Sequence, residues 1–202
     1  MQNINLEEYK GVFVFAQQVD NEISSIALEL LGEAGRLAKP LETQVTAVLL
    51  GSNVGNLTDK LAEYGADRVI VVDNPALETY RTEPYAQALT AVINEFKPEI
   101  MLVGATAIGR DLGPTVSARV ATGLTADCTS LEIGDFPINA IPGKEQKHNQ
   151  LLMTRQLLVE IQSQQSLAQT TDLRWLQYVQ VLCKKLILSQ VQRQKLLTLM
   201  LV

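Results

Sequence analysis

The sequence predicts an α/β fold with three layers, in which helices cover both faces of a parallel sheet. Two observations predict it. Short apolar runs alternate along the chain with longer segments whose apolar residues recur every three or four positions. Strands that are apolar throughout are typical of parallel sheets buried on both faces, and the intervening helices supply the crossover connections that such sheets need.

Five apolar runs are predicted to be strands. They are residues 11–16, 45–50, 68–72, 100–103 and 126–133, and residues 150–155 are expected to extend the sheet. Turn-forming residues close two of these runs, at Gly51 and at Asp73-Asn74-Pro75. No well-patterned strand is expected after residue 156, so the sheet is predicted to be incomplete at its C-terminal end.

The segments between the strands are predicted to be helices. Asp20 or Asn21 is expected to cap the first of them, which stops at Pro40. The others are expected over residues 57–65, 82–96 and 109–121, with Thr82 as a cap.

Composition excludes several classes of protein. The chain has 202 residues, 47% apolar and 19% charged, which is too apolar for a chain disordered throughout. No apolar run is long enough for a membrane-spanning helix, and a net charge of −5 argues against nucleic-acid binding. The N-terminus does not resemble a signal or transit peptide, and two cysteines make no disulfide framework, so a cytoplasmic protein is expected.

The composition changes abruptly near residue 155. All 12 glycines and all 7 prolines lie before residue 144, whereas residues 156–202 carry an excess of basic over acidic side chains and most of the glutamines. Such a break indicates that two differently made segments, 1–155 and 156–202, are joined there.

A glycine-rich motif after the fourth strand is a candidate anion site. It runs from Gly104 to Pro114 and opens a helix, where backbone amides favour an anion and Arg110 could act as its charge partner beside Gly109. The alternative interpretation is a tight turn with an Arg110–Asp111 surface pair. The motif is neither a Walker A loop nor G-x-G-x-x-G.

Two further groups of residues have structural explanations as well as functional ones. Asp127 and Cys128 precede a strand, but a nucleophilic cysteine needs a histidine, and His148 is the single one in the chain. We therefore expect a buried Cys128 and a solvated His148, no catalytic residue and no zinc site. The loop starting Gly51-Ser52-Asn53 is another strand-to-helix junction that could meet an anion, or simply a turn.

The motif 104–114, together with Thr122-Gly-Leu-Thr-Ala-Asp-Cys-Thr129, closely resembles the first domain of the α subunit of electron transfer flavoprotein. The strand at 11–16 and the helix after it are similar to that family too, so the resemblance covers residues 1–155. It implies a sheet like that of the adenine-nucleotide α hydrolases. It also implies a partner-binding domain, without a nucleotide of its own, in an electron carrier that is not an enzyme.

The resemblance further implies a heterodimer with a β subunit. The pair passes electrons from dehydrogenases, such as the acyl-CoA dehydrogenases of fatty acid β-oxidation, to an acceptor. Its FAD is held mainly by a second, C-terminal domain of the α subunit. Gly109 and Arg110 match a motif of the family but not its flavin site.

The likeness stops after Arg155, where the family continues with a string like P-A-F-G-G-N-T-I-A-T-I. Codons that are compatible with residues 156–167 encode that string when they are read one base out of frame. Codons that are compatible with residues 172–183, read in the shifted frame, encode a later string of the family, A-T-V-R-P-G-V-M. We therefore interpret 156–202 as a frameshifted tail of a truncated subunit. On this interpretation the FAD domain is absent, and the tail exposes apolar residues unless a partner covers them.

Two other functions stay open. The first is a small nucleotide-binding α/β module, although Ala16-Gln17-Gln18-Val19 stands where ATP pyrophosphatases carry a Ser-Gly-Gly loop. The second is a pure interaction domain with an amphipathic helical tail.

Overall fold

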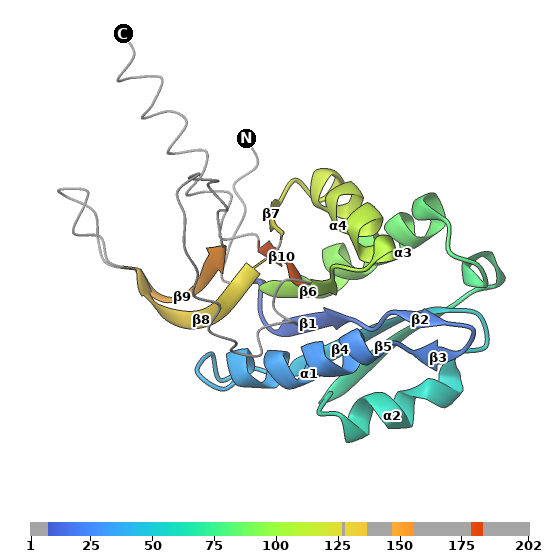
Figure 1. The fold of residues 1–202 in the computed structure, drawn as a ribbon, viewed down its shortest axis with the longest axis horizontal. Helices are drawn as coiled ribbons and strands as arrows, with labels where there is room; N and C mark the ends of the chain where they lie inside the picture. The colour runs from blue at the N-terminus through green and yellow to red at the C-terminus, as the bar shows by residue number, and fades with distance from the viewer. Residues whose placement is uncertain (1–7, 127, 137–146, 156–178, 184–202) are drawn as a thin grey trace, which may run out of the picture.

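A computed structural model describes residues 8–126, 128–136, 147–155 and 179–183. Its centre is a six-stranded sheet with the order β5-β4-β1-β6-β10-β7 (Figure 1). The strands are β5 (Arg68–Asp73), β4 (Val45–Gly51), β1 (Val12–Phe15), β6 (Ile100–Gly104), β10 (Val179–Cys183) and β7 (Gly123–Thr125). β5, β4, β1 and β6 run parallel to one another, as the sequence predicts, whereas β10 runs antiparallel to its neighbours β6 and β7.

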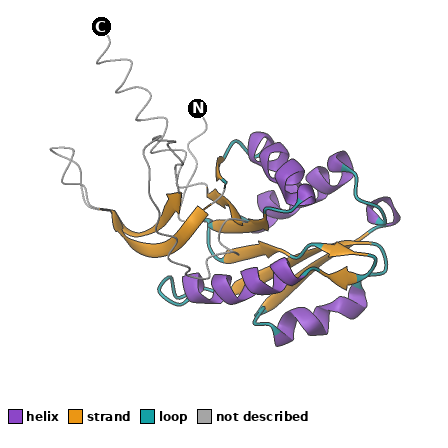
Figure 2. Cartoon of the chain, viewed as in Figure 1, coloured by secondary structure: helices purple, strands orange, loops and turns teal. Residues whose placement is uncertain are grey.

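Helices cover both faces of this sheet (Figure 2). α1 (Ser25–Ala38) and α2 (Thr58–Glu63) enclose one core, and α3 (Thr82–Phe96) and α4 (Ala107–Arg119) enclose the other. Two short 3-10 helices, η2 (Gly55–Leu57) and η3 (Pro75–Leu77), follow β4 and β5. β1, β4 and β6 are buried along their whole length because each has neighbours on both sides and helices above and below. The three-layer prediction is confirmed.

The prediction that Asp20 or Asn21 caps the first helix is wrong. These two residues have positive φ, 52° and 59°, and form the turn between β2 (Gln18–Val19) and β3 (Glu22–Ile23). A two-residue turn with both φ angles positive matches the twist of a β-hairpin, and asparagine and aspartate tolerate it well. α1 therefore begins later, where the Ala27 amide donates to Ser24 Oγ at 3.3 Å.

The starts of α3 and α4 also differ from the predicted ones by one or two residues. Thr82 is the first residue of α3 rather than its cap, since Arg81 holds the N-cap position. α4 begins at Ala107 instead of residue 109, and Thr106 caps it. Helix ends are the least precise part of a periodicity argument, because capping depends on a single side chain.

The prediction that residues 126–133 and 150–155 belong to the main sheet is wrong. β8 (Cys128–Phe136) and β9 (Lys147–Arg155) pair with each other in a separate antiparallel hairpin beside α1 (Figure 1). The reason is visible in β8, where buried Leu131 is followed by exposed Glu132. Such alternation is typical of a strand with one covered face, whereas central parallel strands are apolar throughout.

The expectation of no further strand after residue 156 is wrong for one segment. β10 lies between β6 and β7, so residues 179–183 belong to the central sheet. Trp175, Leu176, Leu196, Leu197 and Leu199, which we expect to be partly exposed, lie outside the described residues.

Candidate functional site

The carboxyl ends of β1 and β6 form the place where ligands usually bind in an open parallel sheet. β1 lies between β4 and β6, so the chain proceeds from β1 to one side and later returns to the other. Loops that leave in opposite directions at such a switch point open a crevice. The loop after β6 carries the predicted anion motif, and the hairpin β2–β3 follows β1 at the same edge.

Gly109 has to be a glycine because the start of α4 packs closely against the end of β6. A Cβ atom at this position would lie 1.8 Å from the carbonyl oxygen of Gly104, which is part of the backbone and cannot move aside cheaply. Gly104 is restricted as well, because its Cβ would meet Ile26 Cγ2 at 2.8 Å. The glycines therefore let the first turn of α4 contact β6, and let β6 contact α1.

The amino terminus of α4 is already satisfied by neighbouring side chains. Thr106 Oγ1 accepts from the Gly109 amide at 3.0 Å and donates to Gln17 Oε1 at 2.5 Å. Arg110 Nε donates to the Ala105 carbonyl at 3.2 Å, which directs the guanidinium back to its own loop. These contacts give Gly109 and Arg110 a structural role, and their role as an anion site stays a prediction.

The side chains of Gln18 and Val54 pack against Gly51 at the end of β4. Gln18 Nε2 donates to the Leu50 carbonyl at 3.3 Å, and Val54 is fully buried. Both side chains lie so close to Gly51 that a Cβ there would be 2.8 Å from Gln18 Nε2 and 2.4 Å from Val54 Cγ1. The backbone N–H of Asn53, a residue with φ 56°, donates to Asp73 Oδ1 at 2.9 Å, as expected if this loop is a turn.

Asp111 does not match the simple interpretation of an Arg110–Asp111 pair. Its Oδ2 accepts two hydrogen bonds of 2.6 Å, from the hydroxyls of Tyr80 and Thr82. The two donors, Thr82 first, hold the pKa of the Asp111 carboxyl below its usual value. Burial, followed by the bond to Asp111, raises the pKa of Tyr80 to about 12. Sequence spacing carries no signal for this cluster, because its parts lie some 30 residues apart (31 and 29).

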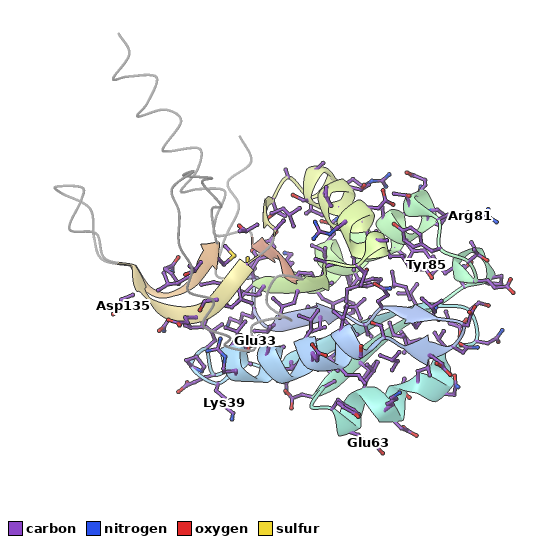
Figure 3. All side chains as sticks on the ribbon, in the orientation of Figure 1. Glu33, Lys39, Glu63, Arg81, Tyr85 and Asp135 are labelled. Carbon is purple, nitrogen blue, oxygen red and sulfur yellow. The ribbon has the colours of Figure 1, made fainter. Side chains whose placement is uncertain are left out.

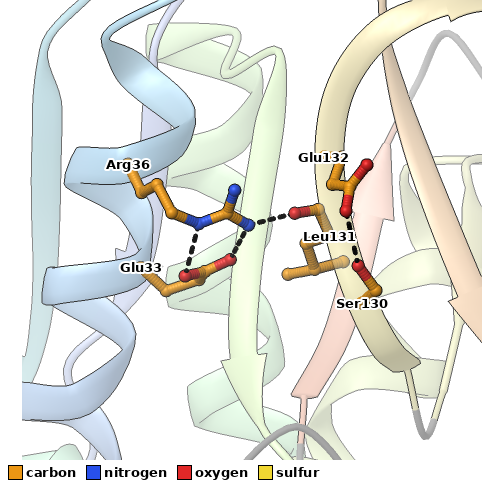
Figure 4. Close-up of polar contacts among 5 residues, drawn as sticks. All are labelled: Glu33, Arg36, Ser130, Leu131 and Glu132. Carbon is orange, nitrogen blue, oxygen red and sulfur yellow. Dashed lines mark hydrogen bonds and ion pairs between the residues drawn. The ribbon is translucent and has the colours of Figure 1, made fainter.

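An ion pair between buried Glu33 and exposed Arg36 fastens the β8–β9 hairpin to α1 (Figure 4). Glu33 is only 8% exposed and binds Arg36 through Oε2–Nε at 3.0 Å and Oε1–Nη2 at 2.5 Å. Arg36 Nη2 also donates to the Leu131 carbonyl of β8. Figure 3 shows the contrast with Lys39, Glu63 and Arg81, which project away from the body of the molecule.

The predicted cysteine and histidine positions lie far apart. Cys128 is fully buried, and its Sγ is 3.7 Å from the Thr125 carbonyl. Cys128 pairs with Arg155, and Lys147 pairs with Phe136. His148 therefore lies at the other end of the hairpin, roughly 20 Å away at about 3.3 Å per residue. Asp127 lies outside the described residues.

Two features are missing from the part of the chain that the structure describes. It contains no helix of the length and apolarity that a membrane crossing requires. Within it, no group of three or more His, Cys, Asp and Glu side chains is placed to hold a metal ion.

The parallel central sheet with helices on both faces defines a three-layer α/β protein, and side chains at the carboxyl edge of its sheet bond to one another and to the backbone. The chain belongs to the electron transfer flavoprotein domain family, whose model matches residues 12–142. The resemblance seen in the sequence is thereby confirmed.

Several curated proteins are similar to this chain over its first two thirds. Protein FixB of Clostridium saccharobutylicum is 54% identical over 130 residues, and the electron transfer flavoprotein subunit alpha of Clostridium acetobutylicum is 50% identical over 130 residues. Each alignment covers 64% of this chain and 39% of the relative. The acryloyl-CoA reductase electron transfer subunit beta of Anaerotignum propionicum is 43% identical over 129 residues, 64% of this chain and 35% of that protein. The chain thus spans well under half the length of these relatives.

Proposed function

We propose that residues 1–155 are the partner-binding first domain of an electron transfer flavoprotein α subunit. The observation that carries this proposal is the family match over residues 12–142, together with relatives named as α subunits. In this role the domain is part of an electron carrier rather than an enzyme, and its task is to bind a β subunit. The redox chemistry belongs to the flavin.

The contacts at the carboxyl edge support a scaffold role. A bound nucleotide needs open space beside the switch point and exposed backbone amides. Here Gln18 and Val54 pack on Gly51, and Thr106 takes the Gly109 amide for itself. A phosphate bound against Gly51 or on the Gly109 amide would have to displace these side chains.

We propose that the loop after β6 is not the place where the family's FAD binds. The close backbone approach that Gly104 and Gly109 allow is already used by Ile26 and by the carbonyl oxygen of Gly104. We therefore place the FAD of the family outside the residues described here and assign no step of electron transfer to them.

The partners we propose are a β subunit and, through it, a flavin-dependent dehydrogenase in the cytoplasm. Two relatives carry the names of enzyme subunits. They are the acryloyl-CoA reductase electron transfer subunit beta and subunit LctC of a lactate dehydrogenase (NAD(+),ferredoxin) from Acetobacterium woodii. These names widen the choice of dehydrogenase beyond fatty acid β-oxidation.

We also propose that residues 156–202 are a frameshifted reading of the family's own gene. The family match ends at residue 142, and the composition changes close behind it. Sequencing the gene across codon 156 tests this directly. A single-base change that restores the family string supports the proposal, and a gene in which no such change does so contradicts it.

Co-expression with a β subunit tests the main proposal. The full chain with a purification tag is expected to retain an untagged β subunit in a one-to-one complex through size-exclusion chromatography. A control chain with Glu63→Gln, a change on the exposed surface of α2, should retain it equally. A chain that folds and never retains a β subunit contradicts the proposal.

The alternative function, a nucleotide-binding module, is tested by calorimetric titration of the free chain with ATP and AMP. Heat that saturates at micromolar nucleotide favours the alternative, and its absence favours the scaffold. The two assays are independent, so each function can fail by itself.

A further inference from the structure

We draw no further inference here: the strongest candidate, the outer edge of β5 with its exposed Val71 side chain, which among the described strands pairs with β4 alone, carries nothing because nothing in the structure shows what covers it.

Discussion

Replacing Arg36 with methionine is expected to destabilise the protein by loosening the hairpin β8–β9 from α1. The substitution removes both bonds to Glu33 and the bond to the Leu131 carbonyl. It leaves the Glu33 carboxylate, 8% exposed, without its cation. The bond to Glu33 chiefly raises the pKa of Arg36, so the guanidinium stays charged at every ordinary pH.

The magnitude follows from the burial of the two partners. Breaking a fully buried ion pair costs about 3–5 kcal/mol, because the remaining charge is desolvated. The Arg36 side chain is 53% exposed, so water can reach the Glu33 carboxylate once the guanidinium is gone. We therefore expect a loss of about 2 kcal/mol, including the unpaired Leu131 carbonyl. In a chain of this size that lowers Tm by about 4–8 °C.

Urea unfolding of the wild-type chain and three variants measures this. The matched control is Arg119→Met, which breaks the pair with Glu83, whose side chain is 64% exposed, and should change stability little. The double variant Glu33→Met/Arg36→Met should regain most of the lost stability, because no charge is then buried alone. Hydrogen exchange at β8 should quicken in Arg36→Met and not in Arg119→Met. If Arg36→Met costs no more than Arg119→Met, the reasoning about a buried pair is refuted.

Three further predictions concern glycines and Tyr80. Gly109→Ala should cost about 3 kcal/mol or more in urea unfolding, because its Cβ would lie 1.8 Å from a backbone oxygen. Gly32→Ala should stabilise α1 by about 0.5–1 kcal/mol, because no atom lies within 4 Å of the added Cβ and alanine favours a helix. A loss of stability in this variant would contradict the open space beside Gly32 in α1. The pKa of Tyr80, raised to about 12 from 10.0, means that the folded state favours the neutral phenol. The stability that Tyr80 contributes over Tyr80→Phe should therefore be full below about pH 10 and vanish as the pH rises through about 12, and a difference that grows with pH would refute it.

The family and the layers follow from local patterns that the sequence contains. Apolar runs and stripes repeat within 5 to 15 residues, so β1, β4, β6 and the long helices could be predicted without knowing their neighbours. The motif from Gly104 to Pro114 can be recognised in the sequence by its glycines, and it indicates the family whether or not it binds a ligand. Its structural meaning, contact with a carbonyl oxygen, needed coordinates.

The tertiary structure alone decided which strands pair and which polar groups meet. The alternation of Leu131 and Glu132 in β8 indicates a strand with one covered face, but it does not show that β9 is the partner strand. Nothing local marks residues 179–183 as a central strand. The same holds for Asp111, whose partners come from the start of α3, and for Arg36, which reaches a carbonyl 95 residues away. Strand pairing and side-chain networks join segments distant in sequence, and their free energy depends on partners that no short pattern specifies.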